Sequence, residues 1–391
     1  MFRNFNMNIL YILRHNPWGI GGGCYASHCY LNAFAKVFED AQFDVCLCGE
    51  YLNDNPSDIE NVHFVKVAER SKVEKVMSPV TGLLHRFDST ARRMLKSKHY
   101  DYCLFDHNSI AGPLVGLCKK LGVKSIVINH NCESEYYRDN HSWIEKAVFL
   151  RHVRNAERKS YLGCDYNIFL TAEDKELFEE LYGISRTCCI VTGCFDKSVN
   201  QNVIPNDNLN PKVRIVISGT IGNIQNMDGI NFFLKELLPC VPKDAEIIIA
   251  GKNPPAGLST EIEILNQTGN YASITLIPNP EDMMSIVNDC NIYLCPTRLG
   301  GGLKLRVMDG LRAGLPVIAH KVSARGYSEF KKAGMLWAFG SQNEFRLALR
   351  EVICQLQEGN IKKSNIRMFA KQQFSFEEKV KLLYERILAG K

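Results

Sequence analysis

A run of glycines followed by two basic residues and an acid is the stretch of this sequence best suited to chemistry. Residues 300–302 are all glycine, Lys304 and Arg306 come directly after them, and Asp309 follows. The start of a helix offers free amide groups and the positive end of the helix dipole, and glycines let an anion come close. Two cations in a first helical turn oppose that dipole unless an anion sits there. The pattern therefore favours a diphosphate site.

Two more residues extend this hypothesis. Asp309 lies about 8–10 Å along the helix axis from its start, at about 1.5 Å per residue, which suits an acid that reaches the ribose of a nucleotide. Arg298 stands just before the glycines and adds a third cation. A tight turn between strand and helix with solvated charges explains the same residues, and it remains open because such loops are common in α/β folds.

The elements around the glycines follow from the hydrophobic pattern. Residues 292–295 form an apolar run typical of a buried strand. Leu303, Val307 and Leu311 then fall on one helical face, and Gly314 and Pro316 end that helix. Residues 316–319 are again strand-like. The expected unit is strand, glycine loop, helix and strand.

Length and composition allow two globular domains. The chain has 391 residues, of which 46% are hydrophobic and 23% charged, and its net charge is +5. This mild charge lacks the concentrated basic stripe of a nucleic-acid binder, so we expect no nucleic-acid partner. The 15 cysteines show no Cys-x-x-Cys spacing and sit mostly in apolar runs, which indicates reduced core thiols. No transmembrane helix or signal peptide is expected.

Strands and helices alternate along the chain, which predicts parallel sheets with crossover helices. The segment from residue 200 to 211 is rich in Asn, Pro and Asp, as linkers are. We place a first domain at 1–200, a linker at 201–212, a second domain at 213–372 and a final helix at 373–391.

Polar residues follow two strands of the first domain. Asp106 and His107 come after the strand expected at 102–105, and His130 and Glu133 follow the strand at 124–128. The carboxyl ends of parallel strands face the binding crevice of a doubly wound sheet. These residues are therefore expected to gather there.

The first glycine loop supports a competing hypothesis. Gly21, Gly23 and Ala26 satisfy the dinucleotide fingerprint, and Glu50 ends the next strand, as in an NAD-binding unit. The connection from Leu13 to Gly21 is longer than the tight turn that this fingerprint needs. An NAD-dependent oxidoreductase stays as an alternative, beside a plain strand–helix loop.

Residues 66–98 carry nine Lys or Arg side chains with apolar residues interspersed. Such an amphipathic basic surface attracts anionic lipid head groups. A solvated helix face explains the same composition.

The stretch from Gly302 to Val317 resembles the donor-binding segment of GT-B glycosyltransferases, specifically glycosyltransferase family 4. That family reads Pro, a Gly-rich loop, Lys or Arg, then Glu-Ala-Met-Ala-x-Gly-x-Pro-Val. Of its two glutamates, which have seven residues between them, the second falls on Asp309 and the first on Gly301, where it is missing. The resemblance implies an α/β GT-B fold: two Rossmann-like domains with parallel sheets facing across a cleft, and a C-terminal helix crossing back to the N-terminal domain.

The resemblance also implies site residues. The catalytic set is His130, Lys304 and Arg306. The donor-binding set is Gly22, Gly23, Gly219, Thr220, Lys252, Pro278, Arg298, Gly301, Gly302, Leu303, Lys304 and Asp309. The acceptor set is Asp106, His107 and Glu133. Many members place an Arg after the glycine that matches Gly219 and a Lys a few residues later. Here Thr220 takes the first position and no Lys follows. The cations around the glycines at 300–302 would therefore contact the donor diphosphate instead.

The function implied is a retaining glycosyltransferase that moves a sugar from a nucleotide-sugar donor to an acceptor hydroxyl in polysaccharide, glycolipid or glycan synthesis. The acceptor would be a carbohydrate or lipid-linked glycan, and neither metal nor cofactor is expected. The expected location is cytoplasmic, with peripheral contact to an anionic membrane through residues 66–98 as an extension that membrane-associated members suggest. A catalytically weak nucleotide-sugar binder is a further alternative, because the first glutamate is absent.

Overall fold

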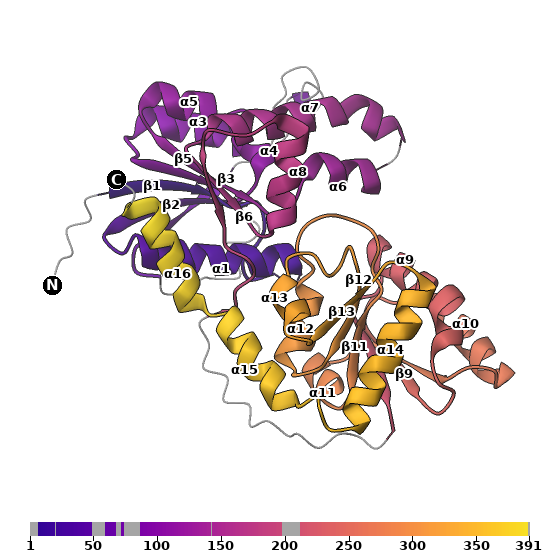
Figure 1. The fold of residues 1–391 in the computed structure, drawn as a ribbon. Helices are drawn as coiled ribbons and strands as arrows, with labels where there is room; N and C mark the ends of the chain where they lie inside the picture. The colour runs from indigo at the N-terminus through magenta and orange to yellow at the C-terminus, as the bar shows by residue number, and fades with distance from the viewer. Residues whose placement is uncertain are drawn as a thin grey trace. The chain divides into compact units, whose positions relative to one another are not determined.

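The computed structural model describes residues 7–19, 21–48, 59–67, 72–73, 87–141, 143–197 and 212–389. The chain divides into two compact units (Figure 1): unit 1 is Met1–Val199 with Ser375–Lys391, and unit 2 is Asn200–Phe374. Glu50 and nearly all of the predicted linker 201–212 lie outside the described residues, as does most of the segment 66–86.

Unit 1 contains a parallel sheet of seven strands among its described residues, in the order β3-β2-β1-β4-β5-β6-β7. Its strands are β1 Met7–Ile12, β2 Ala41–Cys48, β3 Val62–Val67, β4 Tyr102–Phe105, β5 Lys124–Asn129, β6 Tyr166–Phe169 and β7 Cys188–Val191. The order reverses between β1 and β4, which makes this pair the topological switch point where doubly wound folds bind ligands.

Helices cover both faces of this sheet (Figure 1). The helices are α1 Gly22–Val37, α3 Phe87–Ser97, α4 Asn108–Ala111, α5 Val115–Leu121, α6 Glu133–Asn140, α7 Trp143–Gly163 and α8 Ala172–Tyr182. The C-terminal helix α16 Phe376–Leu383, which continues as a π-helical turn over Tyr384–Leu388, packs beside α1. The Phe376 ring lies 6.0 Å from that of Phe195, so this helix completes the core of unit 1.

Local sequence explains where these elements begin and what they bury. Thr171 Oγ1 accepts from the Asp174 amide at 3.0 Å, so α8 starts with a capping box. Phe87 and Leu95 of α3 are buried in the cluster that also contains residues of β1, β4 and α5. The apolar face of α3 is therefore used inside unit 1, which supports the solvated-face interpretation for this helix.

Unit 2 repeats the design with six parallel strands in the order β10-β9-β8-β11-β12-β13 among the described residues. They are β8 Arg214–Thr220, β9 Glu246–Lys252, β10 Ser273–Pro278, β11 Ile292–Cys295, β12 Val317–His320 and β13 Leu336–Phe339. Its switch point lies between β8 and β11. The prediction of two Rossmann-like domains with parallel sheets is confirmed.

The helices of unit 2 also lie on both faces of its sheet, with α9 and α14 on one and α12 and α15 on the other (Figure 1). They are α9 Ile224–Phe232, α10 Ala256–Thr268, α11 Met283–Asn288, α12 Leu305–Arg312, α13 Ser328–Lys332, α14 Gln342–Gln357 and α15 Lys363–Gln373. A π-helical turn over Phe233–Leu237 extends α9.

The predicted order of strand, glycine loop, helix and strand is confirmed as β11, the loop, α12 and β12. The helix begins at Leu305 rather than Leu303, because Lys304 has the extended backbone angles of an N-cap residue, φ −88° and ψ 97°. A Cβ at Gly310 would lie 2.6 Å from Tyr293 Cγ, so the missing side chain lets α12 pack closely on β11.

The cysteines whose side chains are described carry free thiols, most of them buried. No helix in the described part of the chain is both long and apolar enough to span a bilayer.

Candidate functional site

The switch point of unit 2 brings together the end of β8, the chain after β11 and the start of α12. Arg306, the second residue of α12, reaches β8 and the chain after β11: Nη1 lies 3.5 Å from the Ser218 carbonyl oxygen and Nη2 donates to Thr297 Oγ1 at 3.2 Å. Gly219 has a φ of 138°, and a Cβ there would lie 2.6 Å from Arg306 Cδ. Glycine thus lets the arginine lie across the end of β8.

The glycine loop is held next to this arginine. Lys304, the N-cap residue of α12, donates from Nζ to Gln225 Oε1 at 3.1 Å and to the Gly301 carbonyl oxygen at 3.2 Å. Tyr327 fixes the same turn from the other side, because its hydroxyl donates to the Lys304 carbonyl oxygen at 3.0 Å. Gln225 was not singled out from the sequence. The structure therefore joins Gly219, Gly301, Gly302, Leu303, Lys304 and Arg306 in one place.

The first amides of α12 and the Arg306 guanidinium form a cradle for an anion. The hydrogen bonds described for Arg306 end on a carbonyl and a hydroxyl oxygen, which are neutral acceptors. A phosphate would replace these contacts with charge-assisted hydrogen bonds, which are roughly twice as strong. The charge and the neutral partners of Arg306 therefore favour a negatively charged group at this end of unit 2.

Arg298 lies in a different environment. Its Nε and Nη2 donate to the two oxygens of Asp228 at 2.9 and 3.1 Å, and its guanidinium carbon lies 4.6 Å from the centre of the Phe232 ring. This bidentate ion pair directs the Arg298 side chain to α9, the helix whose Gln225 contacts the glycine loop.

Asp309 is the fifth residue of α12, and its side chain is 39% exposed, so solvent and ligands reach it. Arg312 Nη1 lies 3.8 Å from its Oδ1. Burial raises the pKa of the Tyr293 hydroxyl, and the charge of Asp309 raises it further. The Asp309 carboxylate therefore lies near the side chain of Tyr293 in β11.

Strands β9 and β10 end at the same edge of the sheet as β8. Lys252 pairs in register with Thr220, and Pro278 pairs with Gly251. Asn253 and Asn279 follow directly, and both adopt positive φ values, 53° and 48°, that are uncommon outside glycine. Asn253 N donates to Asn279 Oδ1 at 2.9 Å, so the two strained turns support each other. The sequence analysis did not identify these asparagines, although both directly follow strands.

The switch point of unit 1 carries a buried carboxylate–histidine pair. Asp106 is fully buried, its Oδ1 lies 3.0 Å from His130 Nε2, and its Oδ2 accepts from Ser27 Oγ at 2.6 Å. Burial pushes the pKa of Asp106 upwards, but the charge and hydrogen bond of His130 outweigh it and hold the pKa below its usual value. His130 is thereby fixed in orientation, with Nδ1 on the other side of the ring.

A second acid lies beside this pair. Glu133, at the start of α6, lies 3.1 Å from both Arg14 Nη1 and His107 Nδ1. Burial raises the pKa of Glu133, but Arg14 and then His107 hold it well below the ordinary value. Burial, followed by the charge of Arg14, lowers the pKa of His107 to about 3, so this imidazole is neutral at pH 7. His107 Nδ1 also lies 3.1 Å from Arg14 Nη1. This nitrogen can hydrogen-bond to Glu133 or to Arg14, but not to both at once.

Glu157 of α7 holds Glu133 in place. Its buried carboxylate accepts from the amides of Glu133 at 2.7 Å and Ser134 at 3.3 Å, and from the Tyr182 hydroxyl at 2.6 Å. Burial raises the pKa of Glu157 despite these bonds. A carboxylate at the first amides of α6 caps the helix that presents Glu133.

The first glycine loop is filled by a histidine. A Cβ at Gly23 would lie 2.9 Å from the His15 ring, whose centre is 5.4 Å from that of His107. His107 in turn stacks on His130 with ring centres 4.9 Å apart. Gly22 and Gly23 thus border the histidine cluster of unit 1. The imidazole also occupies the approach to the backbone that the dinucleotide fingerprint would require.

Asp106, His107, His130 and Glu133 therefore lie together, as the strand ends predicted. Arg14, His15 and Ser27 join them and were missed, although Arg14 and His15 lie only two and three residues beyond the end of β1. Within the described residues, no group of three His, Cys, Asp or Glu side chains could hold a metal ion.

Comparisons with known proteins agree with this architecture. Residues 214–355 match the family model described as Glycosyl transferases group 1. An uncharacterised 44.6 kDa protein in the cps region of Klebsiella pneumoniae is 23% identical over 252 residues, which cover 61% of this chain and 62% of that protein. The chain thus matches less than two thirds of that relative.

Two solved structures extend the match to nearly the whole chain. HepE of Anabaena in complex with UDP is 15% identical, with a TM-score of 0.62 over 98% of this chain and 100% of that one. WaaG, a glycosyltransferase involved in lipopolysaccharide biosynthesis, is 14% identical, with a TM-score of 0.63 over 98% and 100%. At these identities the similarity shows the fold.

Proposed function

We propose that this chain, whose residues 214–355 match the family model described as Glycosyl transferases group 1, transfers a sugar from a nucleotide-sugar donor to an acceptor hydroxyl with retention of configuration. The observation that carries the proposal is the Arg306 guanidinium, which spans the switch point of unit 2 and hydrogen-bonds to neutral oxygens there. Charge develops on the diphosphate as the glycosidic bond breaks, and prearranged cations stabilise it.

In this proposal unit 2 binds the donor. The diphosphate lies against Gly219, the glycine loop and the start of α12, and Arg306 and Lys304 contact it. Asp309 holds the ribose from further along the helix, while Thr220, Lys252 and Pro278 border the nucleoside side. The HepE structure contains UDP, so UDP is the first nucleotide to test.

Unit 1 provides the acceptor side. Its cations are already neutralised by carboxylates, as the Arg14–Glu133 pair shows. A neutral hydroxyl fits such a site better than an anion does, because a buried anion next to Asp106 and Glu133 would be repelled. His130, held by Asp106, can hydrogen-bond the acceptor hydroxyl, and we assign the acceptor to Asp106, His107, His130 and Glu133.

The acceptor class follows from the relatives. The Klebsiella relative lies in a cps region and WaaG acts in lipopolysaccharide biosynthesis, so we propose a carbohydrate or lipid-linked glycan acceptor in bacterial-type polysaccharide synthesis. Cytoplasmic location and peripheral contact with an anionic membrane belong to the same proposal. Arg93 and Lys96 of α3 are exposed for such contact, whereas Lys98 is paired with Asp44 at 2.7 Å.

A thermal-shift panel of UDP, GDP, ADP, their sugar conjugates and NADH tests the proposal. We expect one nucleoside diphosphate and its sugar conjugate to raise the melting temperature, since a ligand at about 100 times its Kd stabilises by roughly 2.7 kcal/mol. Stabilisation by NADH alone would favour the oxidoreductase alternative instead.

The selected donor is then assayed for slow hydrolysis and for transfer, with and without EDTA. We propose catalysis without metal, so activity should survive chelation. The anomeric configuration of the product, read by NMR, tests retention. Tight donor binding with no hydrolysis and no transfer would support the second candidate, a nucleotide-sugar binder, which the glycine at position 301 favours.

A further inference from the structure

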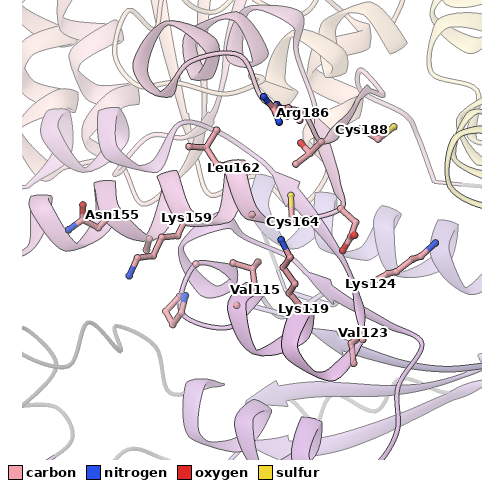
Figure 2. A pocket seen from close by; sticks show the side chains of 18 of the residues that line it. Val115, Lys119, Val123, Lys124, Asn155, Lys159, Leu162, Cys164, Arg186 and Cys188 are labelled. Carbon is pink, nitrogen blue, oxygen red and sulfur yellow. The ribbon is translucent and has the colours of Figure 1, made fainter.

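Unit 1 has a second hollow at the opposite edge of its sheet, and Figure 2 shows it from close by. It is a groove of about 1040 Å³ lined by the starts of β5 and β7, the turn before β6 and the helices α5 and α7. We name it the basic groove after its lining residues, which include Arg92, Lys119, Lys124, His152, Lys159, Asp165 and Arg186.

The basic groove is separate from the acceptor cluster. Lys124 is the first residue of β5, and His130 follows its last residue. Six residues of extended strand span about 20 Å at about 3.3 Å per residue, so the two sites lie at opposite edges of the sheet. A ligand of one site does not touch the other.

Charge is the main property of the groove. Five Lys or Arg side chains line it from α3, α5, α7, the start of β5 and the turn before β7, and Figure 2 labels Lys119, Lys124, Lys159 and Arg186 among them. Lys119, Lys124, Lys159 and Arg186 make no ion pair with any residue of the described segments. Like charges gathered in one hollow repel each other unless an anion joins them.

The one acid of the groove is already used by the fold. Asp165 Oδ2 accepts from the Ser125 amide at 2.7 Å and from Ser125 Oγ at 3.0 Å, which joins β5 to the turn before β6. Arg92 is anchored by one bond, from Nη2 to the Pro113 carbonyl oxygen at 3.0 Å, while its Nε is buried without a hydrogen-bond partner. A buried donor left without a partner is uncommon and marks a place where a ligand atom fits.

The base of the groove is apolar and open. Val115, Val123, Ala156 and Cys164 are buried beneath it. Gly116 lines it from α5, and a Cβ there would meet nothing within 4 Å. The groove therefore offers several cations around a hydrophobic floor.

We propose that the basic groove binds a phosphate-bearing ligand. A phosphate group carries up to two negative charges and three acceptor oxygens, so one group can satisfy several of these cations at once, and guanidinium groups bind it bidentately. Such a phosphate can be free in solution or belong to a lipid head group. This site is independent of the proposed donor site in unit 2.

The test uses the full-length protein and two probes. Tripolyphosphate represents free phosphate and is titrated by calorimetry. Phosphatidylcholine vesicles with and without phosphatidylglycerol represent the membrane and are tested by co-sedimentation. The groove variant is Lys119→Glu with Lys159→Glu. The matched control is Lys120→Glu with Arg158→Glu, because these exposed residues lie on the same two helices and do not line the groove.

We expect at least one probe to bind the wild-type protein, and more weakly at higher salt. The groove variant should bind it at least about tenfold more weakly, as expected when charge-assisted contacts are lost, and the control variant should not. Loss for tripolyphosphate identifies a soluble ligand, and loss for anionic vesicles alone identifies a lipid. UDP affinity should be the same in all three proteins.

A neutral substitution guards against misreading an effect of net charge. Gly116→Leu fills the groove without altering charge and should weaken the same probe. Wild-type protein that binds neither probe, equal loss in the groove and control variants, or full binding by Gly116→Leu would each overturn the proposal.

Discussion

The arginines at the two switch points have different partners. In unit 2 Arg306 lies within hydrogen-bonding distance of a carbonyl and a hydroxyl oxygen. In unit 1 Arg14 pairs with the buried carboxylate of Glu133 at 3.1 Å, and Asp106 adds a second buried carboxylate. The same topology thus presents a positive cradle in one unit and a neutralised acid–base cluster in the other.

This difference teaches how one fold can serve two substrates. An anion approaching Arg306 gains charge-assisted bonds and gives up only neutral ones. An anion approaching Arg14 would have to compete with Glu133, and a neutral hydroxyl would not. Under the proposed function, the electrostatics of each switch point select the ligand, whereas the fold sets its position.

The largest expected effect is the loss of Arg306. Arg306→Ala removes the guanidinium that is proposed to stabilise the leaving diphosphate, and turnover should fall roughly 10²- to 10³-fold, as when one oxyanion donor is lost. Arg350→Ala, an exposed arginine of α14, is the control and should keep wild-type turnover. Equal rates for the two variants would remove Arg306 from the chemistry.

A smaller kinetic effect is expected in unit 1. Asp106→Asn keeps the shape of the side chain but removes the charge that orients His130, and turnover should fall on the order of 10²-fold. UDP affinity should not change, because the donor is assigned to unit 2. A parallel loss of UDP binding would show that the two units do not divide the substrates as we describe.

Packing of α12 gives the next prediction. Gly310→Ala places a Cβ against the Tyr293 ring, and overpacking of this kind costs about 1–3 kcal/mol. Gly257→Ala in α10 meets nothing within 4 Å and should stabilise by roughly 0.5–1 kcal/mol. Urea unfolding measures both. If the two substitutions shift stability alike, α12 is not seated on β11 as described.

The last prediction concerns pH. The folded protein keeps His107 neutral down to about pH 3, whereas the unfolded chain protonates it below about 6.5. The unfolded state then binds the extra proton, so this contribution to stability is complete above pH 6.5 and is lost as the pH falls. Between pH 7 and 5 His107 should account for about 2 kcal/mol of lost stability.

His107→Asn should reduce that pH dependence, measured as urea midpoints at the two pH values. The matching change at His99, whose side chain is 74% exposed, should leave the dependence intact. An unchanged slope for His107→Asn would mean that this histidine is protonated in the fold.

The sequence was most informative where the site is local. Gly302, Lys304, Arg306 and Asp309 lie within eight positions, so the loop and helix could be read from spacing. The strand ends also predicted that Asp106 and His130 would meet.

Contacts between distant residues were not readable in this way. Arg298 and Asp228 are 70 residues apart, and Ser27 is 79 residues from Asp106. Neither pair leaves a local pattern, because register and helix packing bring the partners together. For the same reason Arg14 and His15 were overlooked beside the first glycine loop, where spacing suggested a dinucleotide.

The central claim is that Arg306 and the start of α12 hold a diphosphate. The most direct measurement is calorimetric titration of UDP, or of the nucleoside diphosphate that stabilises the protein most, into wild-type protein, Arg306→Ala and Arg350→Ala. Our account predicts that Arg306→Ala binds at least about tenfold more weakly, as the loss of a charge-assisted contact implies, and that Arg350→Ala binds like wild type. Wild-type affinity in Arg306→Ala would contradict it.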